Sequence, residues 1–70
     1  MTQSERIIRY MQDFGSITPM DAFRMGITKL ATRVSEMRRD GIQIEDDWVK
    51  DKNQFGEPVR FKKYWLEEKS

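Results

Sequence analysis

The stretch that decides the fold is TPMDAFRMGITKLATRVSEMRRDG, residues 18–41. A helix is expected over residues 18–25, because Thr18 is a favourable N-cap and Pro19 suits the first helical position. Gly26 supplies the permissive backbone for a tight turn that ends this helix. The stretch therefore opens with a short helix and a sharp corner.

A second helix is expected over residues 28–40, with Thr28 as its N-cap and Gly41 as its stop. Its apolar side chains share one face at helical spacing, and its polar side chains occupy the other. The apolar positions are Leu30, Val34 and Met37. Two helices joined by so short a turn predict a helix-turn-helix unit.

The flanking segments extend this unit into a larger pattern. Upstream, residues 2–14 have helical periodicity, and Thr2 with Glu5 forms a capping box. Residues 16–17 leave room only for a short extended link. Downstream, alternating residues on both sides of a turn-rich segment predict a hairpin over residues 42–66. We therefore expect an α+β fold, a winged helix-turn-helix with three helices followed by a β-hairpin wing.

Length and composition restrict the function. The 70 residues, 37% hydrophobic, suffice for one domain over residues 1–70. Without cysteine or histidine, the chain lacks a thiolate nucleophile, the usual proton shuttle and the commonest metal ligand, so we expect no enzyme, metal, cofactor or small-molecule ligand. The acidic run at residues 45–47 is weak evidence for a metal site, because successive strand residues point to opposite faces. With no membrane span or signal peptide apparent, we expect a cytoplasmic protein without a membrane partner.

The chain resembles the small winged helix-turn-helix domains encoded in phage and prophage genomes, over residues 5–66. The residues that carry the resemblance are Ile17-Thr18, Asp21-Ala22, Gly26-Ile27-Thr28, Leu30-Ala31, Arg33-Val34-Ser35, Met37-Arg38, Gly41, Ile44, Trp48, Gly56, Tyr64 and Leu66. The resemblance implies binding of double-stranded DNA through a recognition helix and a wing, in the host cytoplasm if the protein is phage-encoded. A transcriptional regulator or a recombination accessory factor of the excisionase kind fits it.

Candidate DNA contacts follow from the chemistry of the two surfaces. Base edges are read by polar side chains in the major groove, and phosphates are held by cations and hydroxyls. The recognition-helix candidates are Thr28, Lys29, Thr32, Arg33, Ser35, Glu36 and Arg39. The phosphate and wing candidates are Thr18, Arg24, Lys50, Lys52, Asn53 and Gln54. Since one such module offers a modest interface, we expect a homodimer or a cooperative neighbour on the DNA.

These residues also have structural interpretations. The polar helix face could be merely solvated, and the strand cations Arg60, Lys62 and Lys63 suit either phosphate contact or protection of an edge strand. Arg33 and Arg38 could pair with acids such as Asp13 or Asp21 while their stems cover the core. Phe55, at the tip of the hairpin, is expected to fold back onto the hairpin.

A second function remains open on the same fold. The net charge is only +1, residues 45–47 are acidic, and the hairpin is rich in aromatic side chains. These features suit a protein-interaction module, such as a phage-encoded inhibitor or adaptor of a host protein.

Overall fold

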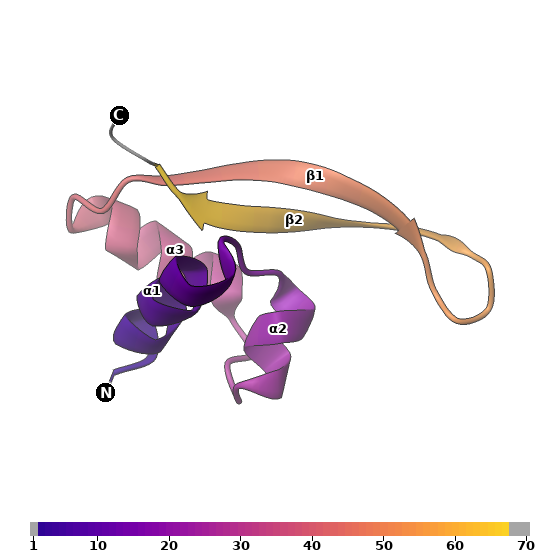
Figure 1. Cartoon of the computed structure of the whole chain (residues 1–70), viewed down its shortest axis with the longest axis horizontal. Coiled ribbons are helices and arrows are strands. Elements are labelled where there is room, and N and C mark those ends of the chain that lie inside the picture. The colour runs from indigo at the N-terminus through magenta and orange to yellow at the C-terminus, as the bar shows by residue number, and fades with distance from the viewer. Residues whose placement is uncertain (1, 68–70) are drawn as a thin grey trace.

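The computed structural model describes residues 2–67. Within them, three helices precede two strands, as Figure 1 shows. The elements are α1 (Gln3–Phe14), α2 (Pro19–Arg24), α3 (Leu30–Arg39), β1 (Ile44–Lys52) and β2 (Pro58–Leu66). The predicted α+β order of three helices and a β-hairpin is confirmed.

Two of the expected helix caps are present. The Thr2 hydroxyl accepts a hydrogen bond from the Glu5 backbone N–H at 3.1 Å. The Glu5 carboxylate accepts from the Thr2 hydroxyl instead of from the Thr2 N–H, so only half of the expected capping box forms. At α2, Thr18 Oγ1 accepts from the Asp21 N–H at 3.2 Å, and the Thr18 N–H donates to the Asp21 carboxylate at 3.0 Å. Each cap supplies partners for backbone groups that the first helical turn leaves free.

The cap predicted for α3 is wrong. The N-cap is Lys29, which makes no side-chain capping bond, so Thr28 lies before the helix rather than at its start. The reason lies in the turn, because the Ile27 N–H donates to the Ala22 carbonyl at 2.8 Å and its side chain is buried. Thr28 and Lys29 therefore connect the buried Ile27 to the first residue of α3.

A short third strand segment ties the helices to the hairpin. β1 and β2 pair antiparallel from Ile44 opposite Leu66 to Lys52 opposite Pro58. Ile17, in the link between α1 and α2, pairs with Tyr64 through hydrogen bonds of 2.8 and 2.9 Å, so the expected extended link forms a β-bridge. The helix-turn-helix unit is therefore attached directly to β2.

The core lies between the helices and the base of the hairpin. Its buried members are Ile7, Met11, Ile17, Ala22, Ile27, Leu30, Val34, Met37, Ile44 and Tyr64. The outer part of the hairpin runs well past the helices, and its tip stands clear of them (Figure 1). Only the base of the hairpin contributes to the buried core.

The position of the tip explains a wrong prediction for Phe55. This side chain is 75% exposed instead of folding back. The Asn53 side chain accepts hydrogen bonds from the N–H groups of Phe55 and Glu57, which closes the loop on itself. The ring is left beyond the reach of the core.

We expect Ile7→Ala to lower the free energy of unfolding by about 2–5 kcal/mol, because it leaves a cavity in a close-packed core. Ile8→Ala is the matched control, since Ile8 is only partly buried on the same helix. Urea unfolding should show a clearly smaller loss for Ile8→Ala. Equal losses at the two positions would contradict this placement of the core.

Candidate nucleic-acid interface

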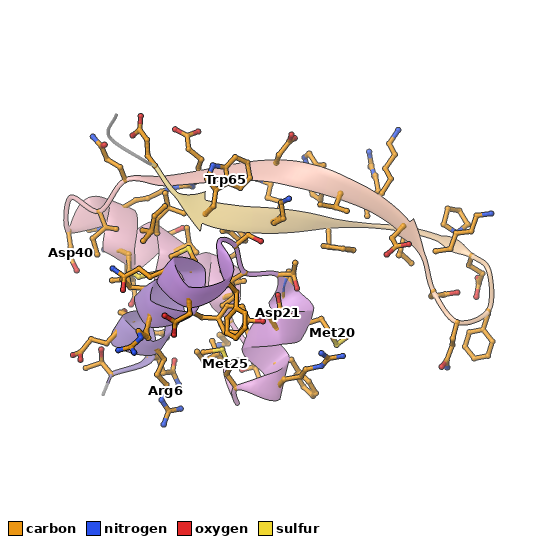
Figure 2. The ribbon with its side chains drawn as sticks, viewed as in Figure 1. Arg6, Met20, Asp21, Met25, Asp40 and Trp65 are labelled. Carbon is orange, nitrogen blue, oxygen red and sulfur yellow. The ribbon has the colours of Figure 1, made fainter. Side chains whose placement is uncertain are left out.

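The polar side of α3 is largely open to solvent. Thr32, Ser35 and Arg39 are exposed on the helix, and Thr28 and Lys29 are exposed just before it. These five side chains are free to meet a ligand. Figure 2 shows the far end of this helix, where Asp40 follows Arg39.

Arg33 and Glu36 are less available. Both are half-buried, and Arg33 Nη1 donates to Glu36 Oε2 at 2.9 Å. The expectation that Arg33 pairs with an acid is confirmed, but the acid is its neighbour on α3 rather than Asp13 or Asp21. Spacing of three residues on a helix places such side chains together.

Arg38 joins the end of α3 to β1. Its Nε and Nη2 donate to the Ile44 carbonyl at 3.1 and 2.7 Å, and Nη2 also donates to Asp46 Oδ2 at 2.7 Å. The hydrogen bond from Arg38 is the main cause that holds the pKa of Asp46 below its ordinary value, and the nearby Lys62 adds to it. Pairing with an acid is again confirmed, with Asp46 as the partner instead of Asp13 or Asp21.

The register of the hairpin separates its charges onto two faces. Directly opposed residues share a face, and successive residues alternate. One face, here called the basic face, carries Trp48, Lys50, Lys52, Arg60 and Lys62, with the carboxylate of Asp46 nearer the base of the hairpin. The opposite face carries Glu45, Asp47, Asp51, Lys63 and Trp65, the last of which is labelled in Figure 2. Cations therefore dominate one face and carboxylates the other.

The basic face contains a pair of like charges. Lys50 lies directly opposite Arg60 across the hairpin, an arrangement that is destabilising by itself. Within residues 2–67, neither side chain forms an ion pair with a carboxylate. An anion bound between them, such as a DNA phosphate, would relieve this repulsion.

An exposed tryptophan lies beside these cations. Trp48 is 57% exposed, and the Arg60 guanidinium and the Lys62 ammonium lie 5.5 and 5.3 Å from its ring centroid. Both distances are in the range of cation–π attraction. The ring therefore helps to hold the two cations on the basic face.

The hairpin twists between its base and its tip. At the base of the hairpin, Ile44 and Tyr64 lie on the same side of the strands as the basic face, and they are buried against the helices. Farther out, Val59 and Phe61 of the opposite face are half-buried and line a groove with Pro19 and Met20 of α2. Met20 extends from α2 on the side of the hairpin tip (Figure 2). Two-stranded ribbons twist strongly, and this twist changes which face meets the helices.

The remaining candidates have different surroundings. Thr18 is engaged in the cap of α2, where the Asp21 carboxylate occupies the position that a phosphate would need. Asn53 shapes the tip loop with its side-chain oxygen. Arg24 and Gln54 are exposed. Of these four candidates, only Arg24 and Gln54 have side chains that form no hydrogen bond or ion pair within residues 2–67.

Two cations of the basic face, Arg60 and Lys62, have two interpretations from the sequence alone, and Trp48 is not among the predicted contacts. Trp48, Arg60 and Lys62 lie with Lys50 and Lys52, whereas Lys63 lies on the opposite face. Strand alternation could have grouped them once the register was known. The hairpin is centred on Phe55, and counting outward from that residue gives the pairing of Lys50 with Arg60.

Other kinds of site are not apparent in the described part of the chain. Among residues 2–67, no group of three or more His, Cys, Asp or Glu side chains could hold a metal ion. No helix in this range has the length and hydrophobicity to cross a bilayer.

Comparison with known proteins agrees with this geometry. A family model described as a winged helix-turn-helix domain matches residues 2–69. The chain belongs to the winged helix-turn-helix family. No curated protein and no solved structure matches it in the same comparisons. Proteins of this family are typically DNA-binding, so membership indicates DNA as the partner.

The ion pair at the end of α3 predicts a dependence of stability on pH. Because the folded protein lowers the pKa of Asp46, the pair stabilises the fold at neutral pH, and this stabilisation is lost as the pH falls through that lowered pKa. Asp46→Asn should therefore be destabilising at about pH 7, and its deficit against the unsubstituted protein should shrink towards about pH 3.

Urea unfolding at both pH values measures this difference. The control is Glu45→Gln, on the opposite face of the hairpin and in no ion pair within residues 2–67. Glu45→Gln should have a smaller effect at neutral pH. A deficit of Asp46→Asn that is unchanged at acid pH would contradict the role assigned to the ion pair.

Proposed function

We propose that this winged helix-turn-helix protein binds double-stranded DNA with the polar side of α3 in the major groove and the basic face of the hairpin on the phosphate backbone. The observation that supports this most strongly is the uncompensated pair of Lys50 and Arg60. Like charges directly opposite each other destabilise the hairpin locally, whereas a bound polyanion is attracted by both.

The two surfaces have different tasks in this proposal. Arg39 and Lys29 have the donors that recognise guanine, and the short side chains of Thr32 and Ser35 allow the helix to approach the base edges. Glu36 can accept from cytosine when it exchanges its contact with Arg33 for one with the base. The basic face supplies affinity without base preference.

The near-neutral net charge is compatible with this function. The net charge of +1 averages over faces of opposite sign. A polyanion meets the local potential of the face that it approaches, which depends on the distribution of charge. The carboxylates of the opposite face would keep DNA from binding on that side, so the two faces together orient the protein.

We place the protein among small transcriptional regulators or recombination accessory factors of the excisionase kind, of phage type and acting in the host cytoplasm. The chain forms one domain over residues 1–70, and the short recognition surface favours a second copy or a cooperative neighbour on the DNA. Thr18 is left out of the proposed contacts because the Asp21 carboxylate fills the position of a phosphate.

The alternative function is that of an inhibitor or adaptor that binds a host protein. The exposed apolar side chains of the helices favour it, since Phe14, Met20 and Phe23 are 70%, 61% and 66% exposed. Exposed aromatic side chains often mark protein interfaces. Met20 lines a groove that also includes Lys52 and Arg60, so this surface borders the basic face.

Fluorescence anisotropy with a random-sequence duplex tests the proposal directly. Affinity should fall steeply between about 50 mM and about 200 mM salt, because phosphate contacts release counterions. A duplex that does not bind at micromolar protein and low salt would overturn the proposal and favour the protein-interaction function.

The contribution of the basic face can be measured by exchanging its charges. The double variant Lys50→Gln/Arg60→Gln should weaken binding to all sequences and reduce the slope of log affinity against log salt by about 2. Lys63→Gln removes a cation from the same strand on the opposite face and should leave the slope nearly unchanged. Equal effects of Arg60→Gln and Lys63→Gln would contradict the division of the hairpin into two faces.

The recognition role of α3 predicts a different result. Once a preferred site has been selected from a random library, Arg39→Ala should cost about 1–3 kcal/mol on that site and should relax its base preference at one position. Its binding to random duplex should change much less. An Arg39→Ala variant that weakens all sequences equally would identify Arg39 as a phosphate contact.

A further inference from the structure

The tip of the hairpin is a closed loop that holds an aromatic ring in solvent. The Asn53 N–H donates to the Glu57 carbonyl at 3.0 Å, and the Gly56 N–H donates to the Asn53 carbonyl at 2.9 Å. Asn53 Oδ1 also accepts from the Phe55 and Glu57 N–H groups at 2.9 and 3.0 Å. Gly56 has a φ of 77°, which other residues rarely adopt. The loop is therefore well defined by its own hydrogen bonds.

Phe55 is the apex of this loop. Its side chain is 75% exposed, which makes it the most exposed of the large hydrophobic residues within residues 2–67. An aromatic ring in water lacks the free energy that burial would supply, so the exposed ring is available to a partner. The loop holds the ring at the far end of the hairpin, where the core cannot cover it (Figure 1).

The charges near the tip favour a nucleic acid as that partner. Lys52 is the last residue of β1, and it continues the basic face that contains Lys50 and Arg60. The nearby acids, Asp51 and Glu57, are at positions that belong to the opposite face of the hairpin. Phe55 therefore projects from the end of a row of cations that can hold a phosphate backbone along one face of the hairpin.

We propose that Phe55 is a wedge that enters the minor groove, unstacks a base step and bends the duplex held by the basic face. Phenylalanine is among the side chains that proteins insert between base steps, and such insertion bends DNA toward the major groove. A ring at the tip of a hairpin can enter a groove that is too narrow for the hairpin itself. This inference rests on the proposed DNA binding and adds to it a change in the shape of the DNA.

Energy transfer between dyes at the two ends of a short random-sequence duplex tests the wedge. Saturating protein should raise the transfer efficiency, because a bend of roughly 20–90° brings the ends closer. Phe55→Ser should abolish most of this rise while weakening anisotropy-measured affinity by less than about 10-fold, since the cations remain. Phe55→Leu should retain the rise, because leucine also acts as a wedge.

Phe14→Ser is the matched control, since it removes a phenyl ring that is 70% exposed on α1, away from the tip of the hairpin (Figure 1). This variant should bend DNA as the unsubstituted protein does. Circular dichroism melts verify that all variants fold. Because these side chains are exposed, we expect the variants to melt like the unsubstituted protein.

The outcomes separate the inference from the function on which it rests. If the protein binds the duplex but the energy-transfer efficiency does not rise, the proposal that Phe55 is a wedge is wrong, whereas the proposed DNA binding still holds. Equal bending by Phe55→Ser overturns it too, because the bend then does not depend on the ring. Absence of any binding to the duplex overturns both the wedge and the proposed function.

Discussion

The pair of hydrogen bonds between Ile17 and Tyr64 connects the two halves of this small protein. Both side chains are buried, so the bridge lies inside the core, where backbone groups need partners. It joins the link between α1 and α2 to the strand that carries Arg60 and Lys62. At the C-terminal end of α3, Arg38 binds the carbonyl of Ile44 and the carboxylate of Asp46. The direction of the hairpin relative to α3 depends on these two attachments, and so does any surface that the two share.

The sequence predicted those features of the fold that depend on contacts between residues close together in the chain. Thr2 and Thr18 cap helices through residues three positions away, so the sequence was sufficient. Thr28 looks equally suitable, yet it lies before α3 because Ile27 must reach the core first. Phe55 was expected to pack locally, but the length of the hairpin and the bonds to Asn53 hold it outside.

The candidate site shows the same limit at the level of charge. The composition contains nearly equal numbers of cations and acids, and alternation along each strand is visible in the sequence. Only the register shows that Arg60 and Lys63 lie on different faces and that Arg60 opposes Lys50. The repulsion between Lys50 and Arg60 is a property of the pair, and neither residue indicates it alone. The fold tolerates this local cost because the base of the hairpin is secured elsewhere by buried contacts.

The two tryptophans of the chain lie on different faces of one ribbon. Trp48 belongs to the basic face, and Trp65 belongs to the opposite face nearer the core. Cations lie against both rings, at 5.3 and 5.5 Å for Trp48 and at 5.8 Å for Trp65. Each face therefore contains its own intrinsic fluorophore. Replacement of one indole by phenylalanine leaves a chain whose emission reports on a single side of the hairpin, so the side that a ligand covers can be identified without an added label.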